Sequence, residues 1–296
     1  MVDVTEIANS EPTPGSAAPG QPKREPAPRR LVAILGRFRK VYSVFLVLIA
    51  WELAAIAIND PLFLPAASAV FATLWTLAAN GLLITDIQAS LSRALGGFTV
   101  AMTLGVPLGI LMGRFRRWDD FWGMLISFSN PIPKIGLVPL FILWLGIGEP
   151  SKIAVVAAGA IFPVLINTYN GVRGVNPILI WRAQTLGPTQ VEILYKVVLP
   201  AALPSIFVGA RLAMALAWVI LIAAEMVAAR SGLGFRILYG QQMFETNVVF
   251  AGLLTISLLG FVFDRLLQAM SHRICGWYFR LDQGDVNDTM ASQTGK

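Results

Sequence analysis

The chain of 296 residues contains one cysteine and one histidine. Cys275 alone excludes an internal disulfide and a metal site built from several cysteines, and with His272 as the single histidine we expect no histidine-based catalytic or metal centre. No G-x-x-x-x-G-K-[S/T] stretch occurs, so the chain lacks the loop with which many ATPases bind nucleotide phosphates. We therefore expect no catalytic residue, no metal site and no cofactor bound by this chain.

Charge is also scarce: 14% of the residues are charged and 56% are hydrophobic, with a mean hydropathy of +0.67. An ordinary soluble domain has about 25% charged residues. The composition therefore predicts an integral membrane protein, and because lipid leaves no backbone polar group unpaired, its spanning segments should be α-helices.

Six apolar runs approach the roughly 20 residues needed to cross a bilayer. We expect membrane spans near residues 41–58, 94–112, 121–145, 153–168, 206–227 and 249–270. Residues 63–83 are apolar but carry Pro and Asn, which favours an interfacial helix and leaves a short extra span open as an alternative. Gly105 and Gly109 form a G-x-x-x-G pattern that permits close helix packing, a weak signal alone.

The net charge of +6 could indicate nucleic-acid binding or membrane topology. With six spans and a cytoplasmic start, 17 of the 23 Lys and Arg residues fall in cytoplasmic segments and 3 in outer segments. This is the bias that the positive-inside rule describes. The sequence therefore predicts a multi-pass membrane protein with both termini in the cytoplasm, contact with lipid and no nucleic-acid partner.

The chain reads as one membrane domain with two tails. The first 30 residues contain six prolines and no apolar core of a signal peptide, so we expect a disordered tail over residues 1–40. The membrane domain should extend over residues 41–272, and a second cytoplasmic tail over residues 273–296.

A few residues inside the predicted spans are expensive to place in lipid. Pro131 and Pro133 should break the third span, and a broken helix at mid-depth often lines a transport pathway. Lys134, Arg211 and Glu225 are candidate pathway residues, the two cations attracting an anion in transit. The alternatives are that Arg211 reaches lipid headgroups, that Lys134 pairs with a carboxylate or a carbonyl, and that Glu225 lies at a gate or a subunit interface.

Residues 181–200, WRAQTLGPTQVEILYKVVLP, form a mostly polar interruption between two apolar runs. Gly187-Pro188 should make a turn between two short helices, and Leu199-Pro200 should close the second one. Four apolar residues recur at helical spacing in that second half and predict one apolar face: Val191, Leu194, Val197 and Val198.

This stretch resembles the EAA loop of ATP-binding-cassette (ABC) importer permeases, whose pattern is Glu-Ala-Ala, three residues, Gly, nine residues, Ile, one residue and Leu-Pro. Ala183, Gly187, Val197 and Leu199-Pro200 match its spacing, whereas Trp181 and Arg182 replace the usual Glu and first Ala. Residues 131–148 and 199–205 are similar to the nitrate, sulfonate, taurine and bicarbonate branch, and the likeness covers residues 91–277.

The resemblance implies an all-α fold of the type I ABC importer permease, with about six transmembrane helices and a cytoplasmic coupling loop at about 173–201. It places such a protein in the bacterial plasma (inner) membrane. It also implies two separate ATPase subunits that hold ATP and Mg, a second permease copy forming a homodimer, and an external solute-binding protein. The residues it assigns to ATPase coupling are Trp181, Arg182, Ala183, Gln184, Leu186, Gly187, Val197, Leu199 and Pro200.

The function expected on this basis is transport of a small anion such as nitrate, sulfonate, taurine or bicarbonate, with no chemistry on the chain itself. The alternative is a self-contained secondary transporter driven by an ion gradient. A membrane-embedded enzyme is a remote third possibility, since it would call for paired mid-membrane carboxylates or a histidine cluster.

Overall fold

The computed structural model describes residues 29–277, which are almost wholly helical. Residue packing separates a unit ending at Ala50 from a second unit beginning at Trp51, and the site lies in the second unit. In chain order the elements are α1 (Arg29–Ile58), α2 (Ala67–Ala79), α3 (Leu82–Arg114), α4 (Arg116–Ser129), the 3-10 turn η1 (Lys134–Leu137), α5 (Val138–Leu145), α6 (Glu149–Arg173), α7 (Pro177–Gln184), α8 (Gln190–Ile193), the π turn η2 (Leu194–Val198), α9 (Leu199–Ala228), α10 (Leu233–Gln242) and α11 (Thr246–Ile274).

Five of the six predicted spans coincide with long apolar elements. Four helical segments within the described residues are long and apolar enough to cross a membrane, and the bent pair of α4 with η1 and α5 brings the number to five. The remaining predicted span, residues 41–58, corresponds to Tyr42–Ile58, a shorter apolar stretch at the end of α1. Hydropathy thus located the spans, whereas the helices extend beyond the predicted ends.

The tail boundaries differ from the prediction. Residues 1–28 of the expected tail lie outside the described part of the chain. Helix α1 begins at Arg29, so residues 29–40 are helical. At the other end α11 continues to Ile274, two residues past the predicted boundary, and residues 278–296 lie outside the described part of the chain. Helix α1 starts early because residues 31–40 contain good helix formers and no proline.

The core consists of α3, α6 and α9, whose buried side chains form one apolar cluster. Glycines on α3 bring its backbone close to α6. A Cβ added at Gly109 would lie 2.7 Å from the Thr168 Cβ and 2.8 Å from the Leu165 carbonyl oxygen, and one at Gly105 would lie 3.0 Å from a Val164 methyl carbon. The G-x-x-x-G pattern therefore marks a real contact face.

The third predicted span breaks where its prolines stand. Helix α4 ends at Ser129, and the segment Lys134–Leu145 leaves it at an angle of 90°. Pro131 and Pro133 fall between the two, where they cannot donate the hydrogen bonds that a continuous helix would need. Helix α2, with 13 residues, is about 20 Å long and too short to cross a bilayer, which removes the extra-span alternative for residues 63–83.

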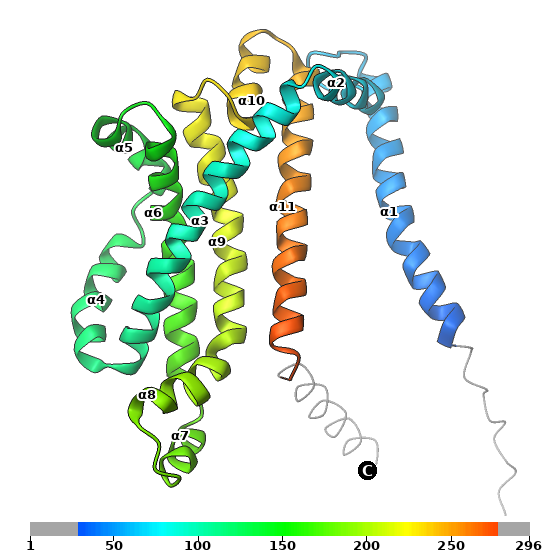
Figure 1. Cartoon of the computed structure of the whole chain (residues 1–296). Coiled ribbons are helices and arrows are strands. Elements are labelled where there is room, and N and C mark those ends of the chain that lie inside the picture. Colours follow the sequence, from blue (N-terminus) through cyan, green and yellow to red (C-terminus); the bar gives the residue numbers. More distant parts are fainter. Residues whose placement is uncertain (1–28, 278–296) are drawn as a thin grey trace, which may run out of the picture. The chain divides into compact units, whose positions relative to one another are not determined.

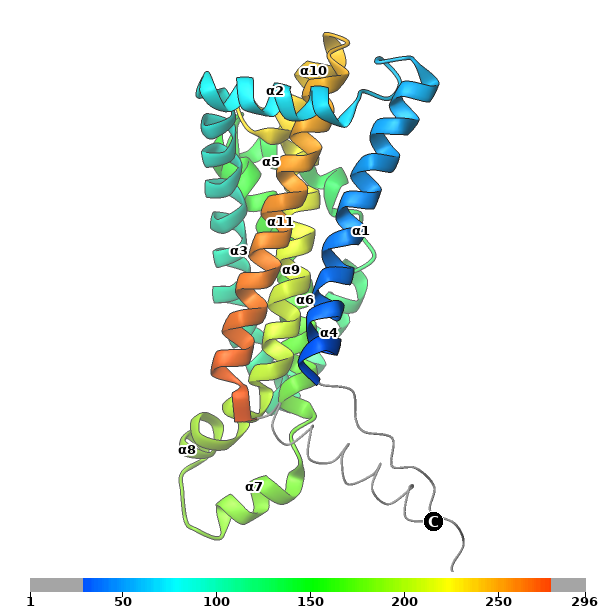
Figure 2. The same ribbon diagram turned by 90° about the vertical axis from the view of Figure 1, so that its right-hand side faces the viewer.

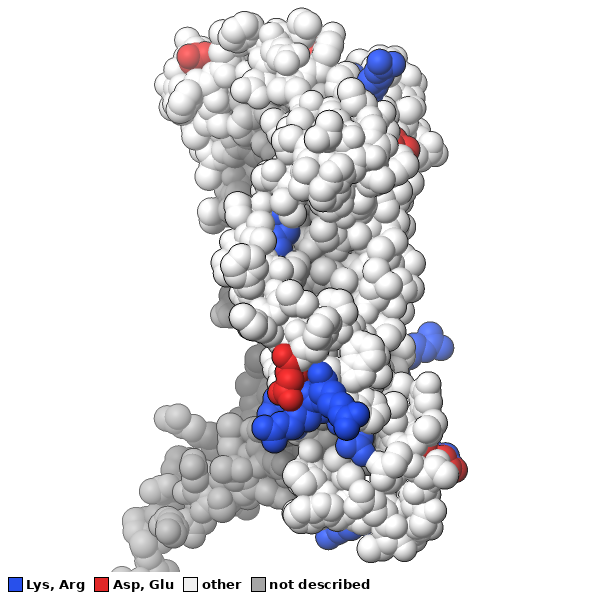
Figure 3. All heavy atoms as spheres, turned by 90° about the vertical axis from the view of Figure 1, so that its left-hand side faces the viewer, with Lys and Arg blue, Asp and Glu red and all other residues white. Residues whose placement is uncertain are grey.

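The second unit has two distinct ends (Figure 1). Helices α7 and α8 lie at one end, called here the loop end, and α2, α5 and α10 lie at the opposite end. Helix α2 runs across the tops of α3 and α11 (Figure 2). The face in Figure 3 is nearly free of charge over most of its height, and its Lys and Arg side chains gather towards the loop end.

Candidate functional site

The loop over residues 181–200 contains the predicted turn between two helical segments. Helix α7 ends at Gln184 and α8 begins at Gln190. Gly187 lies in the turn with a φ of +77°, a left-handed conformation that costs a residue with a Cβ roughly 1–2 kcal/mol. Glycine is therefore the residue that the turn requires.

The prediction that Leu199-Pro200 closes the second helix is wrong. The helical path continues from Gln190 through the π turn η2 into α9 and ends at Ala228. Pro200 stands in the first turn of α9, where a proline ring is tolerated. The π turn just before it rearranges the backbone hydrogen bonds, which explains how the helix passes the proline unbroken.

The loop is anchored at both helix starts. The Asn176 side chain accepts a hydrogen bond from the Ile178 backbone N–H and caps α7, and Thr189 and Glu192 form a reciprocal capping box on α8. The Arg114 guanidinium, at the end of α3, donates a hydrogen bond to the Gln190 side chain. The loop is thus fastened to the core helices.

The apolar face of the second half is shifted from the predicted one. Ile193 and Val198 are buried, and Leu194 and Val197 pack beside them, whereas Val191 is 62% exposed. The predicted coupling residues are mostly exposed at the loop tip: Leu186 is 87% and Trp181 64% exposed, and Arg182, Gln184 and Gly187 are exposed as well. Ala183, Val197, Leu199 and Pro200 are half-buried and form the base of the loop.

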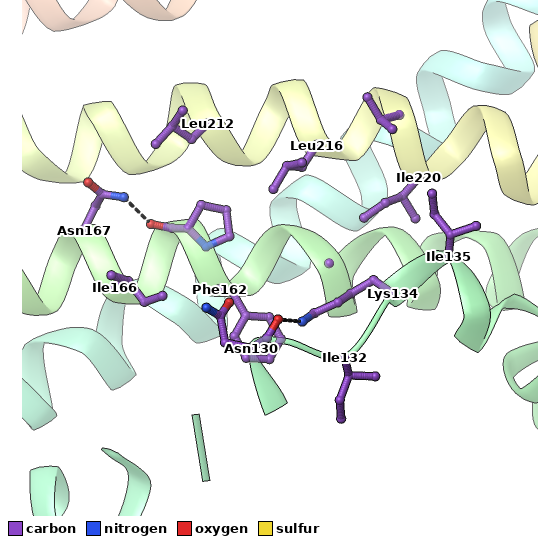
Figure 4. Close-up of a pocket in the computed structure, with 13 residues that line it drawn as sticks. Asn130, Ile132, Lys134, Ile135, Phe162, Ile166, Asn167, Leu212, Leu216 and Ile220 are labelled. Carbon is purple, nitrogen blue, oxygen red and sulfur yellow. Dashed lines mark hydrogen bonds between the residues drawn. The ribbon is translucent and has the colours of Figure 1, made fainter. Parts of the chain in front are cut away.

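A pocket of about 470 Å³ lies between the α4–α5 bend, α6 and α9 (Figure 4). Its walls are mainly aliphatic, and Lys134, Asn130 and Asn167 supply its polar side chains. The Lys134 ammonium donates hydrogen bonds to the carbonyl oxygens of Ser129, at 2.8 Å, and of Asn130, and lies 4.2 Å from the centre of the Phe162 ring. Lys134 therefore pairs with carbonyls at the end of α4, one of the predicted alternatives.

Arg211 lines a separate pocket of about 410 Å³ between α9 and the end of α11. Its Nε donates to the Asp264 carboxylate at 2.8 Å, and both side chains are about 40% exposed, at 39% and 42%. Adjacent residues on a helix point about 100° apart, so Arg211 faces its own pocket while the neighbouring Leu212 lines the Lys134 pocket. The structure does not bring the two predicted cations together.

Glu225 is placed differently from a residue that lines a passage. Its side chain is 1% exposed, and its carboxylate accepts hydrogen bonds from the Arg93 guanidinium at 2.7 Å, the Ser90 hydroxyl at 2.9 Å and the Gly234 backbone N–H at 2.9 Å. Desolvation makes an unpaired carboxylate costly there, so these donors are what allow it to be buried. Glu225 thus lies inside the subunit, away from both pockets.

Arg93 links α3 to α6, α9 and the segment before α10. It is 3% exposed and forms a two-pronged contact with Glu149, with both N–O distances at 2.6 Å, besides its bond to Glu225. It also donates to the Ser231 carbonyl oxygen at 2.7 Å. Arg93 lies one residue before the predicted span over residues 94–112 and was not singled out from the sequence.

Asp86 and Ser90 complete this buried cluster, and neither was singled out from the sequence. Asp86 accepts from the Gly232 backbone N–H at 2.8 Å and from the Arg236 guanidinium at 2.7 Å, while the Ser90 hydroxyl accepts from the Leu233 N–H at 2.8 Å. Asp86, Ser90 and Arg93 are spaced at i, i+4 and i+7, so they share one face of α3. That spacing of polar residues was the available signal.

A family described as the binding-protein-dependent transport system inner membrane component matches residues 105–275, more than half of the chain. The chain belongs to this family. A protein of Methanocaldococcus jannaschii named as an ABC transporter permease is 40% identical over 243 residues, which cover 80% of the permease described here and 91% of the relative. The taurine transport system permease protein TauC of Escherichia coli K12 is 32% identical over 260 residues, covering 86% and 93%.

Solved structures agree on the fold of the permease. One chain of the methionine ABC transporter MetNI, in an inward-facing conformation, superposes with a TM-score of 0.57 at 19% identity, covering 67% of the permease and 98% of that chain. The permease is thus a multi-pass membrane subunit of an ABC importer with the type I fold. This membership decides against the self-contained secondary transporter.

Proposed function

We propose that the permease works as one of two copies that form a passage between them, each copy docking one ATPase subunit through the loop at residues 181–200. The ATPases hold ATP and Mg, and a soluble binding protein delivers the cargo on the other side. Both chain ends lie in the cytoplasm in this arrangement, with the loop end facing the ATPases. The bias of 17 to 3 in Lys and Arg supports that orientation.

The observation that carries the proposal is the exposed tip of the loop. Trp181 and Leu186 are large apolar side chains that the permease leaves in the open, with Arg182 and Gln184 beside them. Apolar residues with a polar rim are typical of protein–protein contact sites. Since the loop end is the end rich in Lys and Arg, it lies outside the hydrocarbon layer, so lipid does not account for this exposure.

The loop is also suited to transmit movement. Helix α8 runs through η2 into α9 without a break, and α9 lines the Lys134 pocket with Leu212, Leu216 and Val219. A displacement of the loop by an ATPase is therefore passed directly along a rigid helix to the pocket. This connection supports the proposal that energy enters at the loop and that the cargo passes through the pocket.

For the cargo we propose a small aliphatic sulfonate, an organic anion with a short carbon chain. The Lys134 pocket offers an ammonium group and two amide side chains on otherwise aliphatic walls. A sulfonate with a short carbon chain presents a matching charged head and apolar tail, whereas nitrate and bicarbonate lack the tail. The relative TauC bears a taurine transport name, which supports the same class.

Replacement of Gly187 tests the docking proposal. Gly187→Val introduces a Cβ at a φ of +77° and should distort the turn that presents Leu186, so the ATPase should no longer co-purify and uptake should fall to background. Gly146→Val is the matched control, because Gly146 has a φ of +78°, has equally open surroundings and lies at the opposite end. Normal ATPase recovery with Gly187→Val, or equal loss in both variants, would count against docking through this loop.

Substitutions of Lys134 and Arg211 distinguish a residue in the cargo path from a residue with a structural role. Lys134→Met should lower the rate of sulfonate uptake in reconstituted vesicles by about tenfold or more while the ATPase still co-purifies, because the pocket loses its positive charge. Arg211→Met should leave uptake within about twofold, since Arg211 lines another pocket and is paired with Asp264. Unchanged uptake with Lys134→Met would remove this pocket from the path.

A further inference from the structure

Within the described part of the chain, two residues other than glycine have a left-handed backbone conformation. Both lie in turns at the end opposite the loop end. Asn59 has a φ of +52° and Phe244 a φ of +57°. Asn tolerates this conformation, but for a bulky residue such as Phe it is a strained outlier. Strain of this kind persists where the surrounding structure enforces it, and it is concentrated at functional positions.

The same two turns expose four large apolar side chains, called here the twin-turn patch. Its members are Leu62 (61% exposed), Phe63 (72%), Met243 (54%) and Phe244 (78%). The Thr246 hydroxyl donates a hydrogen bond of 2.9 Å to the Leu62 carbonyl oxygen, so the two turns adjoin although they are about 180 residues apart in the chain. The patch is therefore one surface built from two distant segments.

The first of these turns is held from within. The Asp60 carboxylate accepts hydrogen bonds from the backbone N–H groups of Leu62, at 3.0 Å, and Phe63, at 3.3 Å. The Trp51 indole N–H donates to the Pro65 carbonyl oxygen at 3.0 Å, and its ring packs against Phe250 of α11. The backbone that carries the apolar side chains of this turn is therefore held in place by hydrogen bonds and by packing against α11.

The second turn follows α10, whose start is fixed by the buried cluster on α3. Three consecutive backbone N–H groups, those of residues 232, 233 and 234, are bound by Asp86, Ser90 and Glu225. Burial of charged and polar groups is tolerated only when each is paired, so such a cluster favours one arrangement of α10 over others. The free-energy cost of burying these charged and polar groups is explained if function requires α10 and the turn after it to be held in one position.

We propose that the twin-turn patch is the docking surface for the soluble solute-binding protein, with Phe244 as its central anchor. This inference rests on the proposed function, which places this end of the permease outside the cell. The family is described as binding-protein-dependent, so a soluble partner must bind on that side. The patch is bordered by three exposed polar residues, Asp60, Gln242 and Glu245. Because charged side chains are costly in hydrocarbon, the patch lies in water. An apolar centre with a polar rim is the usual anatomy of a protein interface.

Phe244→Gly separates docking from folding. Glycine adopts a φ of +57° without strain, and this relief offsets the greater freedom of the unfolded chain, so the variant should be about as stable as the wild type. If Phe244 has only a structural role, the variant should therefore keep full function. The assay uses the intact permease–ATPase complex in lipid nanodiscs and the purified binding protein that uptake requires. Phe244→Gly should raise the concentration of binding protein that half-maximally stimulates ATP hydrolysis about tenfold or more, with the unstimulated rate unchanged.

Trp75→Ala is the matched control, because Trp75 is also 78% exposed and lies at the same end, in the wall of an apolar pocket beside α11. It should leave the half-maximal concentration unchanged. Photocrosslinking from benzoylphenylalanine at position 244 in cells should yield an adduct that mass spectrometry identifies as the same binding protein.

The outcomes distinguish the two proposals. If the wild-type complex is not stimulated by the binding protein, both the proposed function and the docking surface fall. If it is stimulated and Phe244→Gly behaves as wild type, the docking surface alone is refuted. Adducts with phospholipid or with a second permease copy only would also refute it, by assigning the patch to the bilayer or to the dimer.

Discussion

Arg93 holds together three regions of the permease that are far apart in the sequence: α3, the start of α6, and the segment from Glu225 to Ser231. Its guanidinium contacts Glu149, Glu225 and the Ser231 carbonyl oxygen, and its replacement by Met would leave the buried Glu225 carboxylate without its cation. Loss of one partner of a buried ion pair costs about 3–5 kcal/mol, so Arg93→Met should clearly lower the midpoint of thermal unfolding in detergent. The exposed Arg230→Met should change the free energy of unfolding by less than about 0.5 kcal/mol.

A second substitution checks the cause of that loss. Adding Glu225→Gln to Arg93→Met removes the unpaired charge and should recover part of the lost stability, because a neutral amide is less costly to bury than a carboxylate. Equal midpoints for Arg93→Met and Arg230→Met would show that the cluster does not stabilise the fold as described.

Single residues were the part of the site that the sequence predicted least well. Lys134 and Arg211 were identified because a charge inside an apolar run is conspicuous, but their partners, two carbonyl oxygens and Asp264, depend on which helices pack together. Glu225 was predicted as a pathway residue, with a gate or a subunit interface as the alternative, and its partner Arg93 lies 132 residues away. Pairings at such separations are properties of the packing, which one sequence does not reveal.

At the scale of elements, sequence and structure agree where a local rule decides the outcome. Gly187-Pro188 makes the predicted turn, the prolines at 131 and 133 break the third span, and Gly105 and Gly109 face α6. The same rules failed at Pro200, where a proline was read as a stop and stands instead in the first turn of α9. The difference lies in the preceding π turn, Leu194–Val198, whose last residue is buried in the same cluster as Ile193.

At the scale of the whole molecule, the proposed function requires the two ends of the bundle to lie on opposite sides of the membrane. The loop with exposed Leu186 occupies one end, and the twin-turn patch occupies the other. Helix α9 joins the loop to the Lys134 pocket, and the Arg93 cluster ties α10 to the same core helices. In the proposed function, energy input, cargo path and delivery surface therefore follow one another along the length of the bundle.

The most direct test of this arrangement is the side from which the loop can be labelled. A cysteine placed at Leu186, in a background in which Cys275 is replaced by Ser, is treated with a membrane-impermeant maleimide in vesicles of either orientation. The account predicts labelling from the cytoplasmic face only, and protection from it when the ATPase is bound. Labelling from the outer face, or no labelling from either face in the absence of ATPase, would contradict it.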